Sequence, residues 1–269
     1  MPLAVIRDRT NHLLARTAFD NPRQQPERQI SMYDLNQDLA AFHKIALRAH
    51  NRTNLSKVGP YIASQSVVED CAHKRIAALN RNSRRTLEIG IGGGEHVAFE
   101  VPLTPDHEYF GLDLEHEFLA LCRDTFAIPV TAANARNLPF ADATFSTVIA
   151  CSLFEHVEEL GRAAKEIARV LEPDGELLIS IPANGGLAVG LYKLLMTYPY
   201  LRLHGVKRPA AVWHYLNVNC ARRIYAILCR NFDSVIRESS PVRALPWFLS
   251  PLLLYRCSNR RPTTDSGTS

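Results

Sequence analysis

The stretch Thr86-Leu-Glu-Ile-Gly-Ile-Gly-Gly-Gly-Glu95 decides the fold, because a short apolar run passes directly into a cluster of glycines. Residues 85–89 predict a buried strand, and the spacing Gly90-x-Gly92-x-Gly94 predicts the tight turn that follows it. At such a junction, glycines adopt backbone angles that other residues avoid, and they let a ligand approach the main chain closely. The stretch therefore indicates a nucleotide-like cofactor at the end of the first strand.

The glycine spacing also separates two classes of cofactor. A dinucleotide fingerprint counted from Gly90 needs its third glycine at position 95, where this chain has Glu95. A carboxylate beside a helix start would also repel a pyrophosphate, which disfavours a nicotinamide oxidoreductase. S-adenosylmethionine carries no phosphate, and its sulfonium and ammonium groups suit a nearby carboxylate such as Glu88. A glycine-rich turn without a ligand is the other interpretation left open.

Strands and helices alternate outward from this turn, which indicates an α/β fold with a parallel sheet covered on both faces. The further expected strands cover residues 108–114, 128–132, 146–151, 176–181, 232–238 and the end of the apolar run 245–255. The expected helices cover residues 95–99, 115–126, 157–171 and 221–231, after helical patterns between residues 31 and 80.

Asp113 ends the second expected strand, 23 residues after Gly90. A carboxylate at this point can accept both hydroxyls of an adenosine ribose. An isolated aspartate is usually a solvated loop residue, but the position of Asp113 relative to the glycine turn favours ribose binding.

Six motifs follow one another in the order and spacing of a known family. They are Glu88–Gly94, Tyr109–Asp113, Asn134–Phe140, Phe145–Val148, Phe154–Val157 and Arg169–Leu177. Over residues 84–182 the chain resembles the class I S-adenosylmethionine-dependent methyltransferases, and within them the broad type 11 group that acts on small molecules. The resemblance implies a Rossmann-like seven-stranded sheet, mostly parallel, with helices on both faces and a C-terminal antiparallel strand.

The resemblance also implies a set of cofactor contacts. It puts Glu88 and the backbone of Gly90, Gly92 and Gly94 around the methionine part of S-adenosylmethionine. It puts Asp113 on the ribose hydroxyls, in agreement with the position of that residue at the end of a strand.

Three positions depart from the usual family pattern or extend it. Asn134-Ala135 stands where the family usually has Asp-Ala, and the asparagine oxygen can still accept a hydrogen bond from the adenine amino group. Ser146 replaces the aspartate that often begins the motif of the fourth strand, and Cys151 ends that strand beside the cofactor. No metal site is expected, because the six cysteines have no CxxC pair and no metal-ligand spacing.

The reaction of this family needs little from the protein, because the sulfonium is already an activated leaving group. The enzyme chiefly aligns a nucleophile with the methyl carbon and excludes water, and a base serves only where water cannot take the proton. The candidate bases are His156, His214 and Tyr215. For each of them a structural role is the favoured interpretation, and for His156 this is a capping or hydrogen-bonded histidine.

Residues 183–218 interrupt the alternation and are expected to set substrate selectivity. Aromatic side chains stand there beside cations: Tyr192, Tyr198, Tyr200, Trp213 and Tyr215 with Lys193, Arg202, Lys207 and Arg208. This composition favours an amphipathic lid over an apolar or anionic small molecule. Nucleic acid is not expected without a tight basic cluster, and a peripheral membrane contact or a lipid-linked substrate is the main alternative.

Length and composition set the domain organisation. With 269 residues, 46% of them apolar, and a net charge of +4, the chain has material for a large core and no charge that calls for nucleic acid. We expect a flexible leader over 1–30, N-terminal helices over 31–82, a methyltransferase domain over 83–260 with a lid over about 183–218, and a flexible tail over 261–269. Scattered cysteines and the lack of an apolar run long enough to span a bilayer favour a cytoplasmic protein.

We therefore expect an S-adenosylmethionine-dependent methyltransferase whose acceptor is a small molecule or a lipid- or glycan-linked compound. The alternative is a non-catalytic S-adenosylmethionine-binding module with an interaction or regulatory role, which the substitutions at Asn134 and Ser146 keep open. The sequence specifies neither the acceptor atom nor the oligomeric state.

Overall fold

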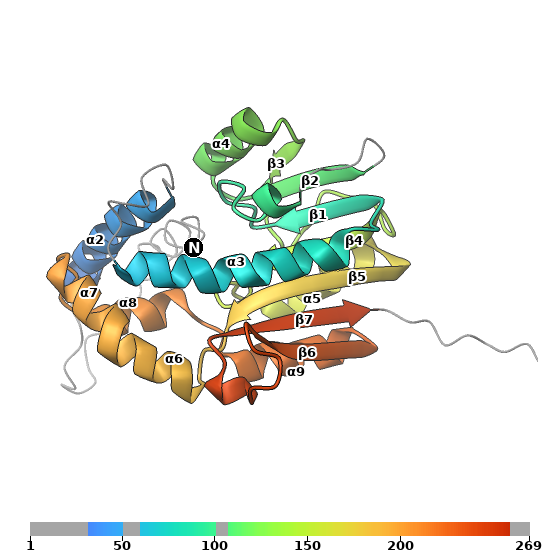
Figure 1. The fold of residues 1–269 in the computed structure, drawn as a ribbon. Helices are drawn as coiled ribbons and strands as arrows, with labels where there is room; N and C mark the ends of the chain where they lie inside the picture. Colours follow the sequence, from blue (N-terminus) through green and yellow to red (C-terminus); the bar gives the residue numbers. More distant parts are fainter. Residues whose placement is uncertain (1–31, 51–59, 101–106, 259–269) are drawn as a thin grey trace, which may run out of the picture.

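The computed structural model describes residues 32–50, 60–100 and 107–258. The expected leader and tail lie outside these ranges, and Figure 1 draws the residues outside them as a thin grey trace. Within the described residues, no helix combines the length and the apolar character that a membrane span requires.

The described residues form one seven-stranded sheet in the order β3-β2-β1-β4-β5-β7-β6 (Figure 1). The strands are β1 (Arg85–Ile89), β2 (Glu108–Asp113), β3 (Val130–Ala132), β4 (Phe145–Cys151), β5 (Leu171–Pro182), β6 (Ser234–Ser240) and β7 (Leu252–Ser258). The first five strands run parallel, whereas β7 pairs antiparallel with both β5 and β6. This confirms the expected Rossmann-like sheet. Its strand order reverses between β1 and β4, where such sheets bind ligands.

Helices cover both faces of the sheet, as expected. The longer ones are α2 (Met32–His50), α3 (Pro60–Asn80), α4 (His116–Phe126), α5 (Leu160–Val170) and α9 (Ala221–Asn231). Successive residues of β4 point to opposite faces, so Ile149 packs with Ile76 of α3, whereas Val148 packs with α5 and α9. Figure 1 shows α3 in front of the sheet and α5 and α9 behind it.

The helix α5 forms because its apolar residues recur at helical spacing. Its buried residues are Leu160, Ala163, Ala164, Ile167 and Val170, which make one stripe toward the sheet. The helix begins three residues later than expected, because the backbone of Glu159 is left-handed with φ of 50°. It ends before Leu171, whose extended backbone begins β5.

One expected helix is wrong. Residues 95–99 form only the short 3-10 turn η2 (Val97–Phe99) instead of a full α-helix. The backbone before it is turned by three glycines with positive φ, the last being Gly94 at 87°. Continuation is also opposed by Pro102 and Pro105, because proline removes a backbone donor and disfavours helical angles in the residue before it.

Other boundaries differ by a few residues. β5 begins at Leu171 rather than at residue 176, because Leu171 pairs with Phe145 across a shift in register. β6 lies two residues later than expected, and β7 continues past the apolar run to Ser258. The expected helix over 221–231 is confirmed as α9.

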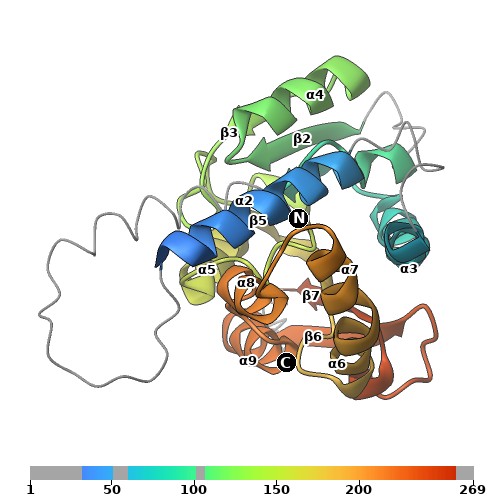
Figure 2. The same ribbon diagram turned by 90° about the vertical axis from the view of Figure 1, so that its left-hand side faces the viewer.

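Residues 187–216 form a series of short helices: α6 (Leu187–Tyr192), the π-helical η3 (Lys193–Thr197), α7 (Tyr198–Leu203) and α8 (Pro209–Leu216). Together with α2 they gather at the edge of the sheet where the parallel strands end, and we call these five elements the cap (Figure 1). Figure 2 looks onto this edge, with α2 lying between α4 and the α7–α8 pair.

The cap packs with Phe118 of α4 around a small core, and it has its own ion pairs. The core consists of Leu39, Phe42, Phe118, Leu201, Val206, Val212 and Leu216. The buried carboxylate of Asp38 on α2 accepts hydrogen bonds from the backbone nitrogen of Lys207 at 2.8 Å and from Nε of Arg208 at 2.9 Å. The segment before the sheet and the segment between β5 and α9 therefore close on one another above the strand ends.

Candidate functional site

The glycine turn takes the geometry that its sequence predicts. Gly90, Gly92 and Gly94 have φ of 73°, 55° and 87°, in the left-handed region that favours glycine. A Cβ at Gly90 would lie 2.9 Å from Leu153 Cδ1, and a Cβ at Gly94 would clash with the ring of Phe126. The turn thus has no room for larger residues at these two positions.

The turn is bonded to the end of β2. The backbone nitrogens of Gly90 and Ile91 donate to the carbonyl oxygen of Leu112 at 2.7 and 3.1 Å. The backbone nitrogen of Gly92 donates to Oδ2 of Asp113 at 3.0 Å. The structure therefore brings the glycines and Asp113 together, as the sequence predicts.

The carboxylate of Asp113 is already largely occupied by backbone donors. Its Oδ1 accepts the backbone N–H groups of Leu114 at 2.7 Å and Glu115 at 3.1 Å, in addition to the bond from Gly92 to Oδ2. Burial raises the pKa of this carboxyl group, and the three N–H donors oppose that rise. A carboxylate accepts about four hydrogen bonds, so the expected contact with the ribose hydroxyls stays a prediction in which they share Asp113 with these backbone donors.

Glu88 stands buried at the end of β1, on the face of the sheet that α3 covers. The hydroxyl of Tyr109 donates to Glu88 Oε2 at 2.8 Å. Burial raises the pKa of Glu88 from its ordinary 4.5 to about 7, while nearby His96 and the Tyr109 hydrogen bond oppose the rise. The group is therefore poised to gain or lose a proton near neutral pH, which is common in functional sites.

A buried polar network adjoins Glu88 that the sequence analysis missed. Nδ1 of His73 on α3 lies 3.2 Å from Nδ1 of His96, and Nε2 of His96 lies 2.8 Å from Glu100 Oε1. The amide of Asn80 donates to the other oxygen of Glu100 at 3.0 Å. The available signal was His96, two residues after the last glycine of the turn and four residues before Glu100, but its other partner, His73, is 23 residues away in the sequence.

The network also contains a set of metal-ligand types. The ligand atoms of His73, His96 and Cys151 lie within 4.8 Å of one another, and such nitrogen and sulfur donors suit zinc. The hydrogen bonds account for the geometry without an ion. One proton lies between the Nδ1 atoms of His73 and His96, and a second is donated by His96 Nε2 to Glu100. Each of these facing atoms then has a hydrogen-bond partner. The expectation that no metal takes part stays a prediction.

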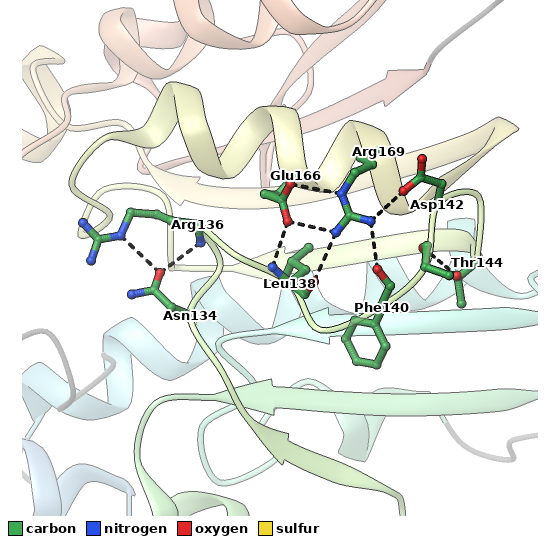
Figure 3. Close-up of polar contacts among 9 residues, drawn as sticks. Asn134, Arg136, Leu138, Phe140, Asp142, Thr144, Glu166 and Arg169 are labelled. Atoms are coloured by element: carbon green, nitrogen blue, oxygen red, sulfur yellow. Dashed lines mark hydrogen bonds and ion pairs between the residues drawn. The ribbon is translucent and has the colours of Figure 1, made fainter.

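The loop after β3 is expected to hold the adenine, and Figure 3 shows how it is fixed. Oδ1 of Asn134 accepts the backbone N–H of Arg136 at 2.9 Å and its Nε at 3.2 Å. The oxygen expected to accept the adenine amino group is thus already bonded to Arg136, while Ala135 is buried beside it. Adenine contact by Asn134 stays a prediction that requires Arg136 to share this oxygen.

Arg169 of α5 anchors the same loop from the neighbouring helix, which Figure 3 draws above the loop. Its guanidinium donates to the carbonyl oxygens of Phe140 at 2.8 Å and Leu138 at 3.1 Å, and to Asp142 Oδ1 at 2.8 Å. It also forms a paired contact with the carboxylate of Glu166, at 3.0 and 2.9 Å. A single arginine therefore fixes the loop through several charge-assisted hydrogen bonds.

The two residues singled out on β4 lie at opposite ends of that strand. The Ser146 hydroxyl bonds to the backbone of Arg85 and to Ser83 Oγ, far from the glycine turn, so its role is structural. Cys151 lies at the end of the strand, where burial and the nearby Glu88 raise the pKa of its thiol. Cys151 thus stays neutral and lies on the side of the sheet where Glu88 stands.

The loop after β4 holds His156 in a structural role, the interpretation that the sequence favoured. Its ring is buried, and Nδ1 donates to the carbonyl oxygen of Leu216 on α8 at 2.9 Å. The buried side chain of Asn219 donates to the carbonyl oxygens of Phe154 at 2.8 Å and Val157 at 2.6 Å. His156 therefore ties this loop to the cap, and Asn219 ties it to the segment between α8 and α9.

The residue before His156 has the more unusual environment. Glu155 is buried, and burial raises the pKa of its carboxyl group from 4.5 to about 8. Its Oε1 lies 3.6 Å from His156 Nε2, and its Oε2 has no hydrogen-bond partner among the described residues. Glu155 lies within the motif Phe154–Val157, and its position in that motif by itself predicted no role for it.

The other two candidate bases lie on α8. His214 is exposed, and Tyr215 is half-buried against the core of the cap. The catalytic roles expected for His214 and Tyr215 stay predictions.

Solved structures share this architecture. An S-adenosylmethionine-dependent methyltransferase from Thermotoga maritima, described as a possible histamine N-methyltransferase, aligns with 82% of this chain and 99% of its own, with a TM-score of 0.58 and 17% identity. The plantazolicin methyltransferase, solved in complex with SAH, aligns with 85% of this chain and 96% of its own, with a TM-score of 0.56 and 12% identity. At these identities the likeness shows the fold, which is that of the Rossmann-like methyltransferases.

Residues 87–179 match the family model described as a methyltransferase domain, of type 11. The sequence match agrees with the fold: residues 87–179 are a methyltransferase domain of the S-adenosylmethionine-dependent type. The family expected from the six motifs is confirmed.

Curated relatives carry the same domain. Phosphatidylethanolamine N-methyltransferase of Cereibacter sphaeroides is 34% identical over 128 residues, which are 44% of this chain and 61% of the relative. Phthiotriol/phenolphthiotriol dimycocerosates methyltransferase 1 of Mycobacterium ulcerans is 28% identical over 109 residues, 39% of this chain and 40% of the relative. Malonyl-[acyl-carrier protein] O-methyltransferase of Geobacter sulfurreducens is 28% identical over 152 residues, 55% of each chain. The matches thus span about half the length of these relatives.

Proposed function

We propose that the chain transfers the methyl group of S-adenosylmethionine to an amphiphilic acceptor, a lipid or a lipid- or glycan-linked small molecule. The observation that carries the proposal is the buried carboxylate of Glu88 beside the glycine turn, with the turn bonded to Asp113 at the end of β2. These three features lie where the strand order of the sheet reverses.

The residues around the turn fit a cofactor that is positively charged and carries no phosphate. Glu88 and Glu95 put two carboxyl groups beside the turn, which would repel a pyrophosphate. Gly90 and Gly92 bring bare backbone to the same place. S-adenosylmethionine meets both conditions, with Glu88 toward the methionine part and Asp113 toward the ribose.

Once bound, S-adenosylmethionine supplies a methyl group on a sulfonium, which is a good leaving group without protein assistance. The chain's own part is then to position the acceptor and to exclude water. In this proposal the cap does so, because its apolar core and the Asp38–Arg208 contacts close the edge of the sheet where the strands end. The expected lid over 183–218 corresponds to the part of the cap between β5 and α9.

Where the acceptor must lose a proton, Glu155 is a better candidate than His156. The pKa of about 8 puts its carboxyl group close to an operating pH near neutrality, and its Oε2 has no partner among the described residues. His156, in contrast, uses Nδ1 to hold α8. A histidine committed to the fold is a poor proton carrier.

The relatives support an acceptor with lipid character. Their names give phosphatidylethanolamine and phthiotriol dimycocerosates as acceptors, and both of these are lipids. The six free cysteines among the described residues agree with a reducing, cytoplasmic location, which we also propose.

The test is a transfer assay with S-adenosylmethionine labelled on its methyl group. The purified chain is mixed with lipid and polar fractions of a host extract, and the labelled product is identified by mass. We expect label in the lipid fraction, and much less with Glu88→Gln. Binding of S-adenosylmethionine without transfer to any fraction would favour the non-catalytic module instead.

A further inference from the structure

The segment between β5 and β6 has an uneven charge. Residues 177–232 contain none of the 27 acidic residues of the chain and seven of its 31 lysines and arginines. These are Lys193, Arg202, Lys207, Arg208, Arg222, Arg223 and Arg230. The net charge of the whole chain is only +4, so this segment is strongly cationic while the rest of the chain is acidic on balance.

The same segment exposes large apolar side chains along one helical run. α6, η3 and α7 follow one another without a break, since Lys193 and Tyr198 at the junctions keep right-handed helical angles. The exposed residues are Leu187, Leu191, Leu194, Leu195, Met196 and Leu203, with exposed fractions between 49% and 84%. Leu187, Leu191 and Leu194 recur at steps of four and three residues, and Leu195 follows four residues after Leu191, so these four lie along one side of the run.

A second segment extends this apolar surface. The short turn η4 (Trp247–Leu249) contacts α6, and the carbonyl oxygen of Phe248 lies close to Gly186 at the start of that helix. Phe248 and Leu249 are themselves exposed, whereas Trp247 packs against the main core. Figures 1 and 2 both place α6 beside the loop before β7. We call the six residues of the run together with Phe248 and Leu249 the docking surface.

Two exposed cations stand close in the sequence to Leu203 of the docking surface. Arg202 on α7 is exposed and adjoins Leu203, and exposed Lys207 follows after the end of that helix. Exposed leucines with neighbouring arginine and lysine are typical of helices that lie in the interface of a bilayer. A soluble monomeric protein rarely exposes so many large apolar side chains close together on its surface.

We propose that the docking surface binds the interface of an anionic lipid bilayer. Its leucines, Met196 and Phe248 enter the boundary between head groups and acyl chains, and Arg202 and Lys207 contact lipid phosphates. A second copy of the chain would also bury the leucines, but it would bring the same cations together. Charge complementarity therefore favours the membrane. This docking needs neither cofactor nor turnover, so it can fail or hold independently of the proposed methyl transfer.

Docking at this place would also bring the acceptor to the candidate site. α6, η3 and α7 belong to the cap, and α8 is tied to the loop after β4 by the His156–Leu216 hydrogen bond. A lipid acceptor would then reach the edge of the sheet from the bilayer without crossing water.

The experiment is vesicle flotation of the full chain, with phosphatidylcholine vesicles and with mixed phosphatidylcholine–phosphatidylglycerol vesicles. We expect binding to the anionic vesicles about tenfold tighter than to the neutral ones, and a loss of this difference in high salt. The double variant Leu194→Ser/Leu195→Ser should weaken binding to both kinds of vesicle about tenfold or more. Ile236→Ser is the matched control, because Ile236 is 52% exposed on β6 and should leave binding unchanged.

The charge is tested separately from the apolar contact. Arg202→Gln/Lys207→Gln should remove the preference for anionic vesicles and keep the weak binding to neutral ones. Both pairs of residues are exposed, and circular dichroism with a titration of S-adenosylmethionine verifies that each variant is folded.

Three results would overturn the proposal. One is no flotation of the wild-type chain with anionic vesicles. Another is equal flotation of the wild type and the double serine variant. The last is a dimer in light scattering that the double serine variant abolishes, since the docking surface would then be the contact between two copies.

Discussion

Glu88 provides the sharpest test of how the site recognises a cationic cofactor. Its carboxyl group has a pKa of about 7 because of burial. A bound sulfonium or ammonium group favours the ionised carboxylate, so cofactor binding should release a proton from Glu88. With this pKa, roughly one carboxyl in eleven is ionised at pH 6 and roughly ten in eleven at pH 8. The dissociation constant of S-adenosylmethionine should therefore rise about tenfold from pH 8 to pH 6, or about 1.4 kcal/mol.

The same pKa has a consequence for stability. Because the pKa rises from 4.5 unfolded to about 7 folded, the native state holds the proton more tightly. The stabilisation from this group is full below pH 4.5 and is lost as the pH rises through 7. Glu88→Gln stays neutral and keeps an oxygen for the Tyr109 hydroxyl, so it avoids this loss. Relative to the wild type, the variant should gain at most about 3 kcal/mol between pH 5 and pH 8.

The assay is calorimetric titration of S-adenosylmethionine at pH 6, 7 and 8, in two buffers of different ionisation enthalpy. The wild type should release about half a proton at pH 7, where half of the Glu88 carboxyls are protonated. The amino group of the cofactor titrates near pH 8 as well, but it does so for both proteins. The difference between wild type and Glu88→Gln therefore isolates Glu88. An identical pH dependence in the two proteins would refute the placement of Glu88 against the cofactor's charge.

Three further predictions concern single side chains. Asp113→Asn should weaken S-adenosylmethionine binding at least about tenfold in calorimetry, through loss of charge-assisted hydrogen bonds worth roughly 1.5–3 kcal/mol; unchanged affinity would remove the ribose assignment. Arg169→Lys should lower the free energy of unfolding by about 1–3 kcal/mol in urea titrations, because a lysine cannot replace the guanidinium contacts to Leu138, Phe140 and Glu166; equal stability would contradict the anchoring role. Glu155→Gln should lower turnover at pH 8 and leave the dissociation constant of S-adenosylmethionine unchanged, and full turnover in the variant would exclude Glu155 as proton acceptor.

The strands could be predicted because their signals are local. β1 and β4 are short runs of apolar and β-branched residues that end at glycines or small polar residues, and such runs identify themselves within a few positions. The sheet order is a different matter, since alternation predicts parallel strands but not their neighbours. That order came from the resemblance over residues 84–182, whose motifs specify the family and with it the topology.

The polar groups of the site could be predicted only in part. Asp113 and the glycines belong to one short segment and to the strand beside it, so their spacing in the sequence placed them together. The partners of His96 are His73, on a helix before the sheet, and Glu100. A tertiary contact between α3 and the turn cannot be seen in a local pattern. No sequence pattern around Glu155 indicates its raised pKa either, because that pKa depends on burial by elements far away in the chain.

The prediction of a helix over residues 95–99 was wrong, because it considered only the helix propensity of these residues and not their neighbours in the chain. Val97, Ala98 and Phe99 follow the glycine turn as the first residues of a helix would, but Pro102 and Pro105 prevent its continuation. The result is a short turn that leaves His96 buried next to Glu88. The departure from the expected helix thus shapes the polar side of the candidate site.

The central claim is that the glycine turn and the end of β2 hold an adenosyl cofactor without phosphates. Calorimetric titration of the full chain with S-adenosylmethionine, S-adenosylhomocysteine and NAD tests it most directly. We predict saturable one-to-one binding of the first two, weakened by Asp113→Asn, and no heat of binding with NAD. Binding of NAD, or no binding of either adenosyl compound, would contradict the claim.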